Sequence, residues 1–100
     1  MNPYIYMFVR RDLSVPQQIV QTAHAVDEIG KRYQSGNENY MVLIDVKNEQ
    51  SLVEVSESLN EKDIEHEMFF EPDIDSYTAI ATRPLIGDER MSLKGYRLMR

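Results

Sequence analysis

Short apolar segments alternate with amphipathic segments along this chain. Residues 4–9 and 41–46 are almost continuously apolar, which is typical of strands that are buried on both faces. Residues 64–70 and 77–82 are rich in residues that favour strands, and Pro84 ends the second of these segments. The pattern therefore predicts four strands.

Two amphipathic segments separate the first three strands. Ser14 and Gln17 have the spacing of a capping box, and Pro16 lies in the first turn, where a helix needs no donor from proline. We predict a helix from there to about residue 34, and a second helix that Asn48 caps and that runs to about residue 60. The inward face predicted for the first helix consists of Val15, Ile19, Val20, Ala23, Val26, Ile29 and Tyr33.

The order of these elements, βαβαββ, predicts an α/β fold. Residues 1–100 are expected to form a single domain with a four-stranded mixed sheet and flanking helices. Residues 72–76 have the composition of a turn. In the C-terminal tail, residues 85–100, the sequence predicts a short helical turn near residues 88–93 and then an edge strand.

The charge is unevenly distributed, although the net value is only −6. Residues 36–75 contain twelve acidic residues and two lysines, which gives this segment a charge of −10. This segment either keeps the domain in solution or forms an acidic face that binds a partner. An overall acidic charge disfavours extended binding to duplex nucleic acid, but a local basic patch can still bind RNA.

Composition also limits the cofactors and the location that we expect. The chain has no cysteine and only two isolated histidines, so we expect neither a disulfide framework nor a metal centre, and no cofactor. The apolar runs are too short to cross a membrane, and the first residues do not have the pattern of a secretory signal. A cytoplasmic protein is the expectation.

Polar side chains follow the first strand and continue along the first helix. Gln17, Gln21, His24 and Glu28 are spaced by four, three and four residues, which places them on one helical face. Ligands of such folds gather at the carboxyl ends of strands, beside helix N-termini. The residues that we expect near this edge are Arg10, Arg11, Asp12, Gln17, Gln21, His24, Glu71 and Asp73.

These residues are similar to a known family. Residues 9–13 (VRRDL), 21–25 (QTAHA) and 78–84 (TAIATRP) resemble segments of the type 2 peptidyl-tRNA hydrolases, of which this chain would be a shortened, divergent member. The resemblance spans about residues 4–84 in the order and type of elements. It implies hydrolysis of the ester between a peptide and tRNA, a tRNA or nucleotide-like partner, and frequent homodimers.

The resemblance also implies roles for individual residues. Glu71 or Asp73 would orient the attacking water, and His24 and Gln21 would place the ester. The residues expected to bind substrate are Arg10, Arg11, Asp12, Gln17 and Thr78, with Arg83, Lys94 and Arg97 as further phosphate contacts. Two positions depart from the family pattern: Gln17 stands where the family has lysine, and Pro72 follows Glu71 where the family has a Gly-Arg-Thr loop.

Alternatives to these roles follow from ordinary structural chemistry. Gln17 is equally explained as the capping partner of Ser14, and Arg10 as the ion-pair partner of Asp12. The whole chain is also consistent with two other functions. One is a non-catalytic protein that binds tRNA ends, nucleotides or small anions on the same fold. The other is an acidic interaction module or inhibitor that acts through residues 36–75.

Overall fold

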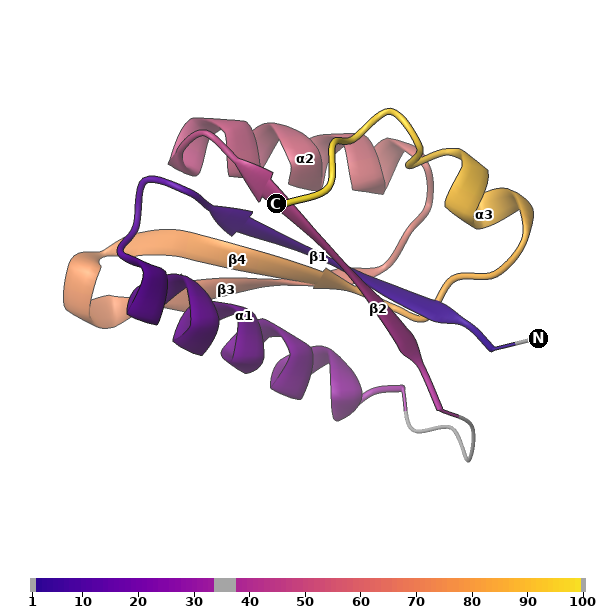
Figure 1. Ribbon diagram of the computed structural model, residues 1–100, viewed down its shortest axis with the longest axis horizontal. Helices are drawn as coiled ribbons and strands as arrows, with labels where there is room; N and C mark the ends of the chain where they lie inside the picture. The colour runs from indigo at the N-terminus through magenta and orange to yellow at the C-terminus, as the bar shows by residue number, and fades with distance from the viewer. Residues whose placement is uncertain (1, 34–37, 100) are drawn as a thin grey trace.

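A four-stranded mixed sheet forms the middle layer of the protein (Figure 1). The computed structural model describes residues 2–33 and 38–99. The strands are β1 (Tyr4–Arg10), β2 (Tyr40–Val46), β3 (His66–Glu71) and β4 (Ser76–Thr82), in the spatial order β2-β1-β4-β3. β1 pairs in parallel with β2, and β4 pairs antiparallel with both β1 and β3. The predicted element order and fold class are confirmed.

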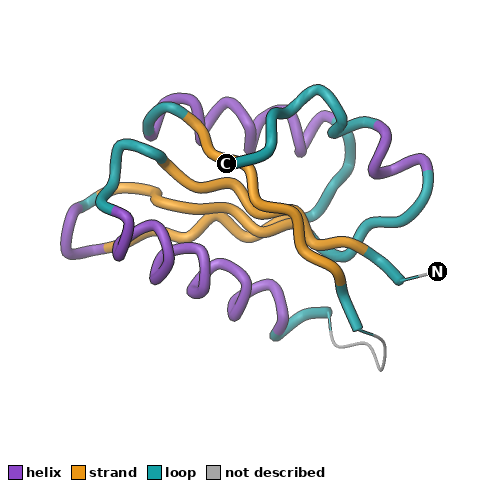
Figure 2. The backbone as a smooth tube through the Cα atoms, viewed as in Figure 1, coloured by secondary structure: helices purple, strands orange, loops and turns teal. Residues whose placement is uncertain are grey.

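Helices cover both faces of this sheet (Figure 2). α1 (Val15–Gly30) joins the parallel strands β1 and β2 and lies on one face. α2 (Glu49–Glu61) and the short α3 (Asp88–Met91) lie on the other face, so the domain has three layers. Alternate residues of β1 point to the two faces: Met7 and Val9 pack towards α1, whereas Tyr6 and Phe8 pack towards α2. None of the helices in the described ranges is long and apolar enough to cross a membrane.

The first helix begins where the sequence predicts and ends earlier. The Ser14 hydroxyl caps it by accepting a hydrogen bond from the backbone N–H of Gln17 at 3.3 Å. The regular helix ends at Gly30, after which Lys31 and Arg32 donate to carbonyls only three residues back. Glycine weakens a helix, and these tighter bonds turn the chain out of it. The predicted extension beyond Gly30 was therefore wrong, and residue 34, its predicted end, lies outside the described residues.

The inward face of α1 also differs from the prediction in its first half. Val15, Ile19, Val20 and Ala23 are exposed, whereas Gln18 and Gln21 are buried against the sheet together with Ala25 and Ile29. This rotation places amide groups at the interface with the sheet, where both amide nitrogens donate hydrogen bonds, although the side-chain oxygen of Gln18 has no partner among the described residues. The Gln18 amide nitrogen, for example, donates to the backbone carbonyl of Leu13 at 2.8 Å.

Side chains also cap α2 and the turn between β3 and β4. Asn48 caps α2 by accepting from the Ser51 N–H at 2.9 Å, as predicted. A short 3-10 turn, Pro72–Ile74, links β3 to β4, and the Glu71 side chain caps it by accepting from the Asp73 N–H. Over residues 85–99, the expected edge strand of the tail is reduced to an isolated bridge, in which the Met99 N–H donates to the Leu43 carbonyl of β2.

Candidate functional site

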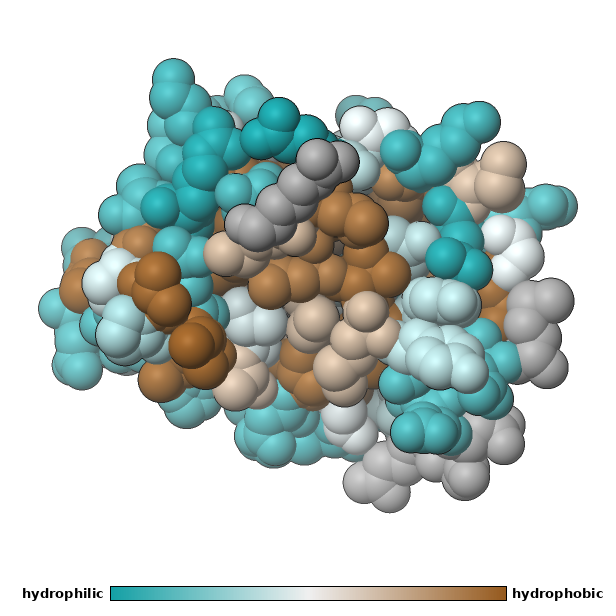
Figure 3. Space-filling view, in the orientation of Figure 1, coloured by the Kyte–Doolittle hydropathy of each residue, from teal (hydrophilic) through white to brown (hydrophobic). Residues whose placement is uncertain are grey.

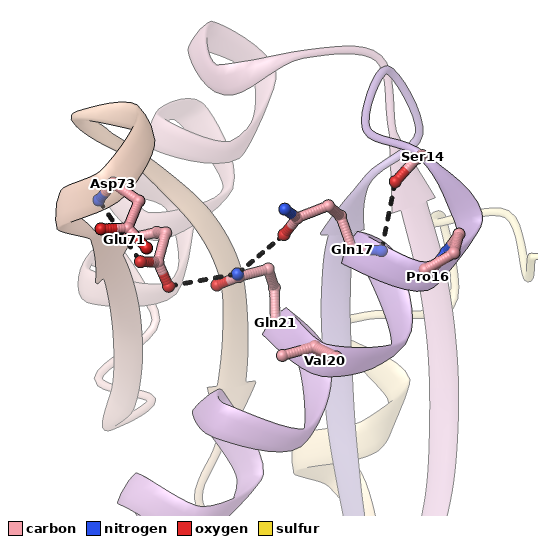
Figure 4. Close-up of a pocket in the computed structure, with 7 residues that line it drawn as sticks. All are labelled: Ser14, Pro16, Gln17, Val20, Gln21, Glu71 and Asp73. Carbon is pink, nitrogen blue, oxygen red and sulfur yellow. Dashed lines mark hydrogen bonds between the residues drawn. The ribbon is translucent and has the colours of Figure 1, made fainter.

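A polar groove of about 400 Å³ lies between the first turns of α1 and the turn that joins β3 to β4 (Figure 4). α1 contributes one wall and β3 with its following turn contributes the other. The groove is lined by Ser14, Pro16, Gln17, Val20, Gln21, Glu71 and Asp73. Four of the predicted site residues therefore come together here: Gln17, Gln21, Glu71 and Asp73.

Gln21 holds the two walls of the groove together. Its side chain is only 2 % exposed, and its carbonyl oxygen accepts a hydrogen bond from the Thr78 hydroxyl at 2.9 Å. Its amide nitrogen donates to the Gln17 Oε1 at 3.0 Å and to the Glu71 Oε2 at 3.2 Å. A carboxylate can only accept hydrogen bonds, so the amide nitrogen of Gln21 has to face Glu71. The orientation of this amide is thereby determined.

Gln21 positions two groups that face the groove. The Glu71 carboxylate is half-buried and also accepts from the Asp73 N–H, at 3.3 Å. Gln17 is exposed, and the bond from Gln21 occupies its side-chain oxygen. Its amide nitrogen, which has no protein partner among the described residues, can donate to a ligand (Figure 4). The groove thus presents a hydrogen-bond donor opposite a carboxylate.

The electrostatics of the groove are acidic. The charged residues among its described lining are Glu71 and Asp73, with no cation beside them. The helix N-terminus offers little to an anion, because Pro16 has no N–H and the N–H of Gln17 already bonds to Ser14. The groove therefore suits water, an amine or a peptide N–H better than it suits phosphate.

Arg10 and Asp12 form a separate fork outside the groove lining. Nε and Nη2 of Arg10 donate to the two carboxylate oxygens of Asp12, each at 2.9 Å. Nη1 of Arg10 donates to the Ser76 hydroxyl at 2.9 Å and to the Tyr77 carbonyl at 3.1 Å. The side-chain hydrogen bonds to Asp12 raise the pKa of Arg10, and the same bonds lower the pKa of Asp12. Arg10 therefore fastens the end of β1 to the start of β4.

Two further predicted site residues lie beside the groove without lining it. His24 is exposed one helical turn beyond Gln21 and stacks on Phe69, with ring centroids 4.7 Å apart and planes at 9°. Thr78 is fully buried behind Gln21, so it holds that amide and is not accessible to a substrate. The sequence had placed Val20 in the core, whereas it is half-exposed and lines the groove.

Basic residues lie at the neighbouring carboxyl edge of the sheet. Arg11 follows β1, its backbone N–H bonds to the carbonyl of Val46 at the end of β2, and Lys47 comes next along the chain. Arg97 is brought to the same part of the sheet because Leu98, the next residue, bridges β2. Within the described parts of the chain, these three exposed side chains form no ion pair. We call Arg11, Lys47 and Arg97 the basic edge. We did not predict Lys47 as a site residue from the sequence, although it directly follows β2, as Arg11 directly follows β1.

The comparisons with known proteins concern the fold. No family model matches the sequence, and no curated protein sequence matches it. Among solved structures, the chain is similar to the protein of unknown function Atu0240 from Agrobacterium tumefaciens strain C58, with a TM-score of 0.73 and 17 % identity. The match covers 100 % of this chain and 99 % of that one. At this identity the similarity shows a shared fold. Over residues 2–33 and 38–99, no group of acidic or histidine side chains is arranged to hold a metal ion.

Proposed function

We propose that this protein hydrolyses the ester that joins a peptide to the terminal ribose of tRNA, with the polar groove as its active site. The observation that carries the proposal is the array around Gln21. One buried amide fixes the Glu71 carboxylate and the Gln17 amide on opposite sides of one open groove. The resemblance of residues 9–25 to the type 2 peptidyl-tRNA hydrolases supplies the substrate class.

The array provides the two groups that ester hydrolysis needs. Glu71 accepts a proton from water as the water oxygen adds to the ester carbonyl carbon. The N–H groups of Gln17 donate to the carbonyl oxygen as it becomes an oxyanion. The intermediate collapses with cleavage of the bond to the ribose oxygen, and Glu71 returns the proton to that leaving oxygen. In other hydrolases, one such amide donor contributes roughly 3–4 kcal/mol to the transition state.

The basic edge supports a nucleic-acid substrate. Arg11 precedes Ser14 of the groove by three residues, so their backbones lie within about 10 Å of each other. The acidic groove and the basic edge therefore divide the substrate between them, with the ester in the groove and the phosphates of the acceptor strand on Arg11, Lys47 and Arg97. Because these cations would neutralise phosphates, the binding affinity should fall as the salt concentration rises. Replacing one of these cations should weaken binding and reduce the salt dependence.

A second candidate function is binding without hydrolysis. Its supporting observation is the acidic lining, because the two carboxylates attract a cationic ligand such as the free amine of an aminoacyl or peptidyl group. In that case Glu71 and Asp73 hold the amine, and Gln17 contacts the adjacent carbonyl. A small anion in this groove would lie beside two negative charges, so the geometry favours the amine.

Release of labelled peptide from peptidyl-tRNA distinguishes these functions. We expect turnover by the wild-type protein, and a loss of about 100-fold or more in kcat for Glu71→Gln and for Gln17→Ala. Glu28→Gln is the matched control, since Glu28 lies on the same helix but pairs with Lys31. His24→Ala should retain most of the activity, because His24 does not line the groove. Saturable binding of aminoacyl-tRNA without turnover would favour the second candidate. Absence of both activities would refute both proposals.

A further inference from the structure

A hollow of about 370 Å³ lies beside the basic edge, on the face of the sheet that α2 covers. The end of β2, the first two turns of α2 and the C-terminal tail form its walls. The tail reaches this place because Leu98 bridges Ile44 of β2. The volume is within the range of sites for small molecules. This space, which we call the Tyr96 hollow, is lined by Val46, Lys47, Ser51, Glu54, Val55 and Tyr96.

Tyr96 gives this hollow an aromatic wall among cations. Its ring is half-buried and packs edge-on against Phe8, with ring centroids 5.1 Å apart and planes at 78°. The ammonium of Lys62 lies 5.8 Å from the centroid of the Tyr96 ring, Lys47 lines the same hollow, and Arg97 is the next residue along the chain. Proteins hold single-stranded nucleic acid in this way, because bases stack on an aromatic ring while cations attract the phosphates.

Two side chains of opposite charge line the Tyr96 hollow without pairing. Over residues 2–33 and 38–99, neither Lys47 nor Glu54 forms an ion pair, although both are exposed at the same space. In Figure 3, hydrophilic side chains cover the upper left of the view, where α2 begins in Figure 1. A carboxylate only accepts hydrogen bonds. A ligand of this hollow should therefore carry a negative group for Lys47 and a hydrogen-bond donor for Glu54.

We infer that the Tyr96 hollow binds a nucleotide whose base carries an amino group. A nucleotide combines the three required features, which are a flat ring for Tyr96, a phosphate for Lys47 and, in cytosine, an amino group that donates to Glu54. Uracil has a carbonyl at the position of that amino group, so its oxygen would face the Glu54 carboxylate. The hollow should therefore select cytosine over uracil.

The position of the hollow also suits the end of tRNA, and this part of the inference rests on the proposed function. Val46 of the hollow pairs with Arg10 in the register of β2 with β1, and Arg10 bonds to Ser76 at the start of β4, so the hollow and the polar groove lie at the same end of the sheet. From β2 to β3 there are three strand spacings, about 14 Å. A few nucleotides of a single strand can cover this span past Arg11. Two cytidines precede the terminal adenosine of tRNA, so a cytosine can occupy the hollow while the ester lies in the polar groove.

Titration of the full chain with cytidine monophosphate (CMP) or uridine monophosphate (UMP), followed by the NMR shifts of backbone amides, tests the inference. We expect CMP to bind at the hollow with a Kd on the order of 1 mM, and UMP to bind about fivefold more weakly. Glu54→Gln should bind both nucleotides equally, because an amide can both accept and donate. Glu57→Gln is the matched control, since Glu57 is exposed on the same helix but does not line the hollow, and it should keep the preference for CMP.

The aromatic wall is tested with the same two probes. Tyr96→Leu should weaken the binding of both nucleotides by about tenfold, whereas Tyr96→Phe should retain it, because the phenyl ring still stacks on a base. Tyr96 packs against Phe8, so circular dichroism checks that the leucine variant is folded. If that variant does not fold, the comparison of wild type with Glu54→Gln decides the inference by itself.

Three outcomes would overturn the inference. They are the absence of saturable CMP binding up to about 20 mM, equal affinities of the wild-type protein for CMP and UMP, and a preference for CMP that Glu54→Gln retains.

The inference and the proposed hydrolysis can fail separately. Glu71→Gln should bind CMP like the wild-type protein, because Glu71 lines the other groove. Turnover of peptidyl-tRNA without selective CMP binding would refute the inference alone, and selective CMP binding without turnover would refute the hydrolysis alone. For the tRNA end, Glu54→Gln should raise KM for peptidyl-tRNA about fivefold and leave kcat unchanged, because this contact is remote from the reacting ester. An unchanged KM together with selective CMP binding would assign the hollow to a free nucleotide.

Discussion

The hydrogen bond from Thr78 to Gln21 allows a sharp test of the proposed array. Thr78→Val removes the hydroxyl and keeps the shape of the side chain. Both partners are buried, Thr78 completely and Gln21 to all but 2 %, so the variant leaves the carbonyl oxygen of Gln21 without a donor. An orphaned buried group costs about 1–3 kcal/mol. For a domain of this size, a loss of 2 kcal/mol lowers Tm by roughly 8–16 °C.

Urea unfolding followed by circular dichroism measures this loss directly. Thr22→Val is the matched control, because the Thr22 hydroxyl donates only to the helix carbonyl of Gln18 and its removal should change stability by less than about 0.5 kcal/mol. Gln21→Leu removes the unpaired oxygen together with the hydrogen bonds to Gln17 and Glu71, so the loss in the double variant Thr78→Val with Gln21→Leu should be smaller than the sum of the two single losses. Equal stability of Thr78→Val and the wild-type protein, or additive losses in the double variant, would refute the described role of Gln21.

Two further predictions concern the ends of β1 and α2. The hydrogen bonds with Arg10 lower the pKa of Asp12, so their stabilisation is present above the unfolded pKa of about 3.9 and is lost as pH falls through the lower folded value. The wild-type protein should be more stable than Asp12→Asn by at most about 1 kcal/mol, because this ion pair is partly exposed. This difference in stability should shrink below about pH 4. A difference that stays constant down to about pH 2 would contradict this cause. Asn48→Ala should cost about 1 kcal/mol by removing the cap on Ser51, whereas Asn60→Ala, exposed at the other end of α2, should be neutral by the same unfolding measurement.

The strands and the helix starts could be predicted because local rules determine them. Strands β1 and β2 are apolar enough to be buried from both sides, and each was predicted within one residue of its observed bounds. Ser14 and Asn48 begin the two long helices through side chains that accept backbone N–H groups nearby. Each of these bonds connects two residues that are three apart, so both partners can be recognised in one short stretch of the sequence.

The orientation of α1 could not be predicted in the same way. Counting apolar residues placed Val15, Ile19 and Val20 inside, because burying a glutamine without partners is unfavourable. The partners exist but are distant in sequence: Gln21 bonds to Thr78 and to Glu71, which follow it by 57 and 50 residues. Only the pairing of β4 with β1 and β3 brings these groups to α1. The same rotation opens the polar groove and exposes the apolar residues on its other side.

The glutamine at position 17 is consistent with this array, although the resemblance to the type 2 peptidyl-tRNA hydrolases implies a lysine at this position. Gln21 directs two N–H groups outward, one to Glu71 and one to the side-chain oxygen of Gln17. A lysine ammonium has no acceptor, so it would leave the second N–H of Gln21 without a partner and would pair with Glu71 instead. An amide at position 17 accepts from Gln21 and still has its own N–H groups for a carbonyl. Gln17 and Gln21 therefore form a matched pair that leaves Glu71 without a cationic partner, which the proposed role of Glu71 as a base requires.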